Sequence, residues 1–152
     1  MEYSFDTCSF IDLNHIYPLD IFPSVWDWIS SQIDNDVIVA TIYVYDEIRP
    51  IQDEIHEFLK DRRRKVFQST DSAQDRIVDD IVNHRFPGWV IPHSTSNKAD
   101  PFVIALASVN DLTVVTEEKL NPDKVTIPRV CNALGVKCIN LLEFLRESKF
   151  KI

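Results

Sequence analysis

Glycine, cysteine and long apolar runs are all scarce in this sequence. Two glycines occur in 152 residues, and neither the phosphate-binding pattern GxxxxGKS/T nor the dinucleotide pattern GxGxxG is present, which argues against nucleotide-binding enzymes of those types. The three cysteines, Cys8, Cys131 and Cys138, lack CxxC spacing, so neither a disulfide framework nor a thiolate zinc site is expected. Without an apolar run of the roughly 20 residues that span a bilayer, or a signal peptide, we expect a soluble, cytoplasmic protein with no membrane partner.

The charge balance is acidic, with 24 Asp and Glu against 16 Lys and Arg and a formal net charge of -8. The whole molecule therefore does not attract polyanions, and a nucleic-acid partner would need a local basic patch. The dense cluster KDRRRK at 60–65 offers Arg62, Arg63, Arg64 and Lys65 as contacts for RNA phosphates. The preferred interpretation of the same cluster is a solvated helix end, where cations complement the helix dipole.

Short apolar runs alternate with amphipathic stretches, which predicts an α/β fold: a mostly parallel central sheet with helices on both faces. The length and the 45% hydrophobic content suit a single domain over residues 1–152. The predicted strands are Glu2–Asp6, Asp36–Thr41, Leu112–Thr116 and Val136–Ile139. The predicted helices are Pro18–Ile33 with Asp20 as its cap, Ile42–Ile48, Ile51–Arg64, Ser72–His84, Ala99–Val109, Ile127–Leu134 and Leu141–Glu147, with a loop over 85–98.

Acidic residues stand where these elements approach one edge of the predicted sheet. Asp6 ends the first strand, and Glu117 and Glu118 directly follow the strand LTVVT. Asp100 begins a helix, and Glu47 lies about one and a half turns after the strand DVIVAT. Because the functional crevice of an open parallel sheet lies beyond the carboxyl ends of its strands, these carboxylates can converge.

Converging carboxylates repel one another and raise one another's pKa values, so the group needs a positive charge between them. Mg²⁺ or Mn²⁺ takes oxygen ligands and can supply a water nucleophile for phosphodiester hydrolysis. Taken singly, Asp6 also suits a turn, Asp100 a helix cap, Glu47 a helix surface and Glu117 with Glu118 a solvated turn. The joint pattern favours a metal site.

Several motifs, in this order and spacing, resemble those of the PIN-domain superfamily, which includes the VapC-type toxins. They are DTCSFI at the N-terminus, YDEI after the second strand, ADPFVIALA and TVVTEEK. The stretches YPLDIFPSVWDWI and CNALGVKCINLLEFL resemble more closely a PIN-like branch carried as a domain of unknown function. The resemblance covers nearly the whole chain and implies a PIN-like three-layer sandwich.

The resemblance also implies roles for individual residues. It makes Asp6, Glu47, Asp100 and Glu118 the catalytic acids, with the ion held by Asp6 and Asp100, Glu47 sharing or positioning it, and Glu118 orienting a water or a second ion. Glu118 stands where the family commonly has Asp, which lengthens the arm. Thr7 and Thr116 match hydroxyls that hold the acids or a metal-bound water through hydrogen bonds. Glu117 is a less likely match than Glu118 for the fourth acid and is placed with the supporting residues.

The implied function is a metal-dependent ribonuclease, commonly a toxin that a cognate antitoxin protein inhibits. Two alternatives stay open: a catalytically inactive PIN-like binding scaffold, and a structure-specific DNA nuclease. Relatives often form homodimers, and the apolar face of Val25, Trp28 and Ile29 suits either such a contact or the core.

Two residue types are expected to take no catalytic part. Cys8 is interpreted as an inert buried thiol. The four histidines have no metal-site spacing and are interpreted as surface or satisfied residues: His15, His56, His84 and His93.

Overall fold

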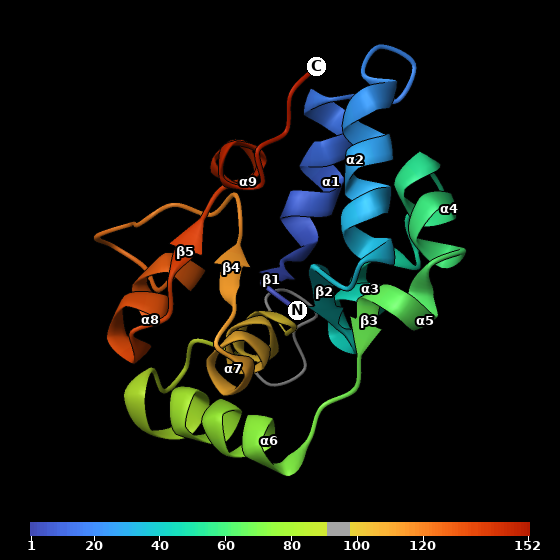
Figure 1. Cartoon of the computed structure of the whole chain (residues 1–152). Helices are drawn as coiled ribbons and strands as arrows, with labels where there is room; N and C mark the ends of the chain where they lie inside the picture. Colours follow the sequence, from blue (N-terminus) through green and yellow to red (C-terminus); the bar gives the residue numbers. More distant parts are fainter. Residues whose placement is uncertain (91–97) are drawn as a thin grey trace.

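Five parallel strands form the central sheet, in the order β3-β2-β1-β4-β5 (Figure 1). The computed structural model describes residues 1–90 and 98–152. The α/β prediction is confirmed, and every pairing is parallel. The strands are β1 Tyr3–Phe5, β2 Ile38–Thr41, β3 Phe67–Gln68, β4 Thr113–Val115 and β5 Cys138–Ile139.

Helices cover both faces of the sheet, which makes a three-layer α/β sandwich (Figure 1). Side chains alternate along β1: the rings of Tyr3 and Phe5 both pack edge-on against Phe144, whereas Ser4 Oγ donates to the carbonyl of Val103 at 2.9 Å on the opposite face. The helices are α1 Thr7–Ile16, α2 Pro23–Asp34, α3 Ile42–Ile48, α4 Glu54–Lys60, α5 Arg63–Val66, α6 Ser72–Asp79 with the π-helical η1 Asp80–Arg85, α7 Asp100–Asn110, α8 Ile127–Leu134 and α9 Leu141–Glu147.

Helices α3, α8 and α9 have the predicted bounds, and Gly135 ends α8 as predicted. Its φ of 69° lies in the left-handed region, which glycine adopts without the strain that a Cβ brings. Leu141–Glu147 begins with a capping box in which Asn140 accepts from the Glu143 amide at 2.8 Å. Local capping chemistry therefore fixes the end of α8 and the start of α9.

The predicted start of α2 is wrong, and α1 was not predicted. Residues 18–22 form a turn closed by the Phe22 amide bonding to the Pro18 carbonyl at 2.8 Å. Pro23 takes the first turn of α2, and Asp20 caps no helix. The ten residues of α1 begin directly after β1 because the Asp6 side chain accepts from the Thr7 amide. Asp6 thus lies at the end of the strand and also caps the helix, so the sequence pattern gave no separate indication that α1 begins at Thr7.

The prediction of one helix over residues 51–64 is also wrong, because the structure has two shorter helices there. Asp53 caps α4 through the amides of Ile55 and His56, and a second short helix, α5, precedes the unpredicted β3. Two residues are too few for strand periodicity to register. In the predicted loop 85–98, residues 91–97 lie outside the described residues. No helix among residues 1–90 and 98–152 has the length and apolar character needed to cross a membrane.

The strand order reverses between β1 and β4. From β1 the chain builds outward through β2 and β3, then returns to the other side of β1 for β4 and β5. Strands β1 and β4 pair directly, with Phe5 opposite Val115. In sheets of this kind, the crevice beyond the carboxyl ends at the reversal point is where ligands bind. Asp6 and Thr116 are the first residues after these two strands.

Candidate metal centre

Asp6 is the most enclosed acid of the site, with 3% of its surface exposed. Its Oδ1 accepts from the Thr7 amide at 2.7 Å. Its Oδ2 accepts from Thr116 Oγ1 at 2.8 Å and from Cys8 Sγ at 3.0 Å. These bonds tie the carboxylate to β1, α1 and the end of β4, so its orientation is fixed by the sheet edge.

Asp100 and Glu118 bring two more carboxylates to Asp6. Asp100 is the first residue of α7 and is 8% exposed. Glu118 lies in the turn after β4, where its amide donates to Thr116 Oγ1 at 3.2 Å. Asp6, Asp100 and Glu118 each offer an oxygen within 4.8 Å of those of the other two. The predicted convergence of these three acids is therefore present.

Burial and mutual repulsion raise the pKa values of these acids. For Asp100, burial is the largest cause, followed by the charges of Asp6, Glu118 and Glu47, and the pKa rises to about 9. Burial and the Asp6 charge raise the pKa of Glu118 to about 7. Burial also raises the pKa of Asp6. Among the described residues, no Lys or Arg forms an ion pair with these carboxylates.

Glu47 stands beside this group as a fourth acid. Thr7 Oγ1 donates to its Oε2, and the amide of Ala99 approaches its Oε1 at 3.4 Å. Glu47 therefore links the residue after Asp6 to the residue before Asp100. Burial raises its pKa, and its charge acts on Asp100, although it is not among the three acids whose oxygens converge.

The predicted supporting residues divide into two cases. Thr116 donates to Asp6 and Thr7 donates to Glu47, so both hydroxyls hold acids of the site. The carboxylate of Glu117 instead accepts from the Leu141 amide at 2.6 Å, at the start of α9. Glu117 reaches the site through its backbone, because its amide donates to Cys8 Sγ at 3.2 Å.

Cys8 is the site residue that sequence reasoning missed. Its thiol donates to Asp6 and lies 3.4 Å from Thr116 Oγ1. Burial and the neighbouring Asp6 charge raise its pKa far above the usual value for a thiol, so the group stays protonated and keeps its donor. The sequence held one signal for this contact: Cys8 lies two residues after Asp6, the acid that caps α1. The side chain of a capping residue lies close to the first turn of its helix.

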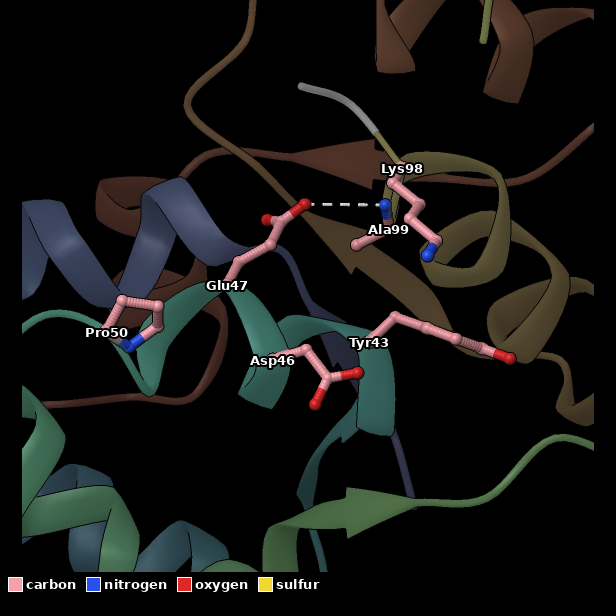
Figure 2. A pocket seen from close by; sticks show the side chains of 6 residues that line it. All are labelled: Tyr43, Asp46, Glu47, Pro50, Lys98 and Ala99. Carbon is pink, nitrogen blue, oxygen red and sulfur yellow. Dashed lines mark hydrogen bonds between the residues drawn. The ribbon is translucent and has the colours of Figure 1, made fainter. Parts of the chain in front are cut away.

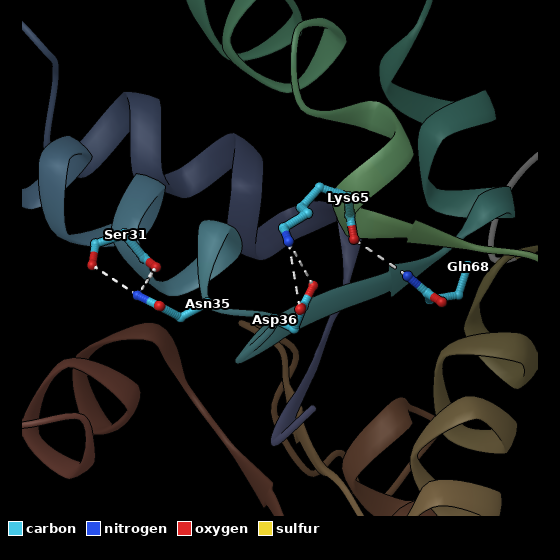
Figure 3. A network of polar contacts seen from close by, with 5 residues as sticks. All are labelled: Ser31, Asn35, Asp36, Lys65 and Gln68. Carbon is cyan, nitrogen blue, oxygen red and sulfur yellow. Dashed lines mark hydrogen bonds and ion pairs between the residues drawn. The ribbon is translucent and has the colours of Figure 1, made fainter.

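The basic cluster lies away from these acids. Lys65 Nζ is 3.4 Å from Asp36 Oδ1, at the amino end of β2 (Figure 3), whereas the acids follow the carboxyl ends of the parallel strands. Arg62 is engaged with Ser30 Oγ at 2.8 Å and stacks over the Phe58 ring. The cluster at 60–65 therefore lies near the amino ends of the strands, away from the acids, and both interpretations of it stay predictions.

The predicted dimer face and the histidines lie elsewhere. Val25 and Ile29 are buried in the core, and Trp28 Nε1 donates to Ser148 Oγ at 3.0 Å. Val25 and Ile29 therefore serve the core, whereas Trp28 is only partly buried. Among the described histidines, His56 lies near Glu57 and His84 near Asp79, and none joins the acidic group. His93 lies outside the described residues.

A pocket of about 500 Å³ opens beside Glu47, lined by Tyr43, Asp46, Glu47, Pro50, Lys98 and Ala99 (Figure 2). Its residues come from α3, from the turn after α3 and from the segment leading into α7. The pocket and the acidic site thus share Glu47.

Comparison with curated proteins finds no match to this chain. Comparison with protein families finds one that is described as a domain of unknown function, DUF4411, and it matches residues 3–152. The match includes the three converging carboxylates and both of the supporting threonines. The chain therefore belongs to the DUF4411 family.

Proposed function

We propose that this protein is a metal-dependent ribonuclease that hydrolyses RNA phosphodiester bonds with Mg²⁺ or Mn²⁺, and that it acts in the cytoplasm as the toxin of a toxin-antitoxin pair. One observation carries the proposal: Asp6, Asp100 and Glu118 offer oxygens within 4.8 Å of one another. They lie at the reversal point of a parallel sheet, where ligands bind. The PIN-like order of the motifs supports the same reaction.

The donor set fits a hard divalent cation. Its atoms are all carboxylate oxygens, which suit Mg²⁺ and Mn²⁺ better than softer metals. The raised pKa values of Asp100 and Glu118 are what an acidic group has when no cation offsets its charges. Asp6 and Asp100 would hold the ion, and Glu47 would share or position it.

The ion supplies charge neutralisation and water activation when bound. The chain's own residues do the positioning. Thr116, Cys8 and the Thr7 amide fix both oxygens of Asp6. Thr7 and the Ala99 amide orient Glu47. Glu118 would accept a hydrogen bond from the attacking water, which aligns it with the scissile phosphate.

The test is incubation of the purified protein with total RNA, with Mn²⁺ or Mg²⁺ and with a chelator, followed by mapping of fragment ends. We expect defined cleavage that the chelator abolishes. Asp6→Asn should reduce cleavage by at least about 100-fold, because it removes a ligand charge while Asn still caps α1. Asp53→Asn, at the cap of α4, is the matched control and should cleave as the wild type does.

Near-wild-type cleavage by Asp6→Asn would refute the assignment of the site. Cleavage of DNA instead of RNA would favour the structure-specific DNA nuclease. An absence of cleavage, with no specific metal-induced rise in melting temperature, would favour the inactive scaffold. The cognate antitoxin and the homodimer are partners proposed from the resemblance alone.

A further inference from the structure

We propose that the pocket beside Glu47, called here the Tyr43 pocket, binds one unpaired nucleotide of the RNA strand next to the phosphate that is cut. The inference rests on the proposed ribonuclease function. The Tyr43 pocket is lined by Tyr43, Asp46, Glu47, Pro50, Lys98 and Ala99, and its volume of about 500 Å³ lies in the range of small-ligand sites.

The location of the pocket makes it part of the substrate path. Glu47 forms one of its walls and is held by Thr7, the neighbour of Asp6. Ala99 forms another wall, and its amide approaches Glu47 Oε1 at 3.4 Å (Figure 2). Asp100 follows Ala99 directly. A nucleotide in this pocket therefore has its phosphate close to the three carboxylates.

Tyr43 gives the pocket an aromatic platform. The Tyr43 ring lies 4.1 Å from the Phe102 ring between centroids, at an interplanar angle of 34°. This contact holds the Tyr43 ring in place before a ligand arrives, which lowers the entropic cost of binding. Stacking on such rings accepts any base, because every base has a π face.

Lys98 supplies the charge that a phosphate requires. The side chain is exposed, and among the described residues its ammonium has no ion pair or hydrogen bond. In Figure 2 the ammonium extends over the pocket toward Tyr43. Its setting is otherwise acidic, with Asp46 and Glu47 on the facing wall. A cation at this place offsets the repulsion between those acids and an RNA phosphate.

Asp46 makes the Tyr43 pocket favour a nucleotide over a simple anion such as free phosphate. Its carboxylate repels a free phosphate but accepts hydrogen bonds from the N–H groups on the edge of a base. The ring of Tyr43 suits the face of a base, the ammonium of Lys98 suits a phosphate, and the carboxylate of Asp46 suits the edge of a base. The three groups together select a nucleotide, and none of them does so alone.

The test measures binding of a fluorescently labelled, short single-stranded RNA by anisotropy, in chelator and at low salt, so that cleavage plays no part. Tyr43→Leu should raise the Kd about tenfold, the loss expected for one stacked base. Tyr43→Phe should bind as the wild type does. Tyr45→Leu is the matched control, since Tyr45 lies on the same helix and packs instead against Phe67; it should change the Kd by less than about twofold.

Lys98→Gln should raise the Kd about fivefold and reduce the slope of log Kd against log salt by about 0.7, the value for one phosphate contact on a single strand. Lys151→Gln, also exposed, should leave the slope unchanged. Wild-type protein that binds no RNA, or Tyr43→Leu that binds as tightly as Tyr45→Leu, would overturn the pocket assignment. Cleavage by that same protein would leave the ribonuclease proposal standing, so the two failures are distinguishable.

Discussion

At the residue scale, the acids of the site were predictable and their support was only partly so. Asp6, Asp100 and Glu118 stand at element ends that parallel-sheet topology brings to one edge, and they converge. Thr7 and Thr116, which the resemblance makes supporting hydroxyls, each donate to an acid of the site. The role of Cys8 was missed although its main partner, Asp6, is only two residues away, whereas the bond from the Leu141 amide that turns the Glu117 carboxylate away was not predictable, because the partners are 24 residues apart.

Cys8 provides the test at this scale. Cys8→Ala removes one of the three hydrogen bonds to Asp6, so we expect Mn²⁺ affinity to fall about tenfold, as losses of groups that orient metal ligands do. Cys8→Ser keeps a donor and should bind Mn²⁺ within about threefold of wild type. Calorimetric titration measures both. Cys138→Ala, a half-buried cysteine on β5, is the control; equal affinities for all the variants would show that Cys8 does not orient Asp6.

At the scale of elements, a terminating glycine and a cap mark two of the boundaries that were predicted correctly. Helices α8 and α9 are bounded by Gly135 and Asn140, and both have the predicted ends. Helix α1 was missed because its cap is also the last acid of a strand. Strand β3 was missed because two residues are too few to show the alternation of apolar and polar side chains that is typical of a strand. Strand β3 is defined only by its pairing with β2, whereas the start of α1 is set by a local cap.

Gly135→Ala tests the boundary at the end of α8. No heavy atom lies within 4 Å of an added Cβ, so the cost is the left-handed backbone alone, about 1 kcal/mol. We expect the melting temperature to fall by a few degrees while Mn²⁺ affinity is unchanged. Thermal melts with and without Mn²⁺ measure this. A change in Mn²⁺ affinity would mean that α8 helps to set the position of Glu118.

At the scale of the whole molecule, the acidic site should make stability depend on pH. The folded-state pKa values of Asp100 and Glu118 are raised to about 9 and about 7, above the ordinary values of about 4 that apply to the unfolded chain. The folded protein then binds more protons than the unfolded chain, and stability is greatest below the unfolded values. In chelator, we expect the melting temperature to fall as pH rises from about 5 to about 9.

Asp100→Asn should flatten this dependence, because the amide replaces a carboxyl group whose pKa is raised to about 9. Mn²⁺ should flatten it in the wild type as well, because a bound cation stabilises the ionised carboxylates. A melting temperature that rises over the same pH range in chelator would contradict the electrostatic description of the site.

The most direct measurement of the central claim is the anomalous scattering of crystals grown with Mn²⁺. The claim is that three carboxylates share one cation: Asp6 directly after β1, Asp100 at the start of α7 and Glu118 after β4. We predict an anomalous peak within bonding distance of Asp6 and Asp100, with Glu118 near it, that is absent from Asp100→Asn crystals grown in the same way. Mn²⁺ bound elsewhere, with no peak between these three acids, would contradict the account.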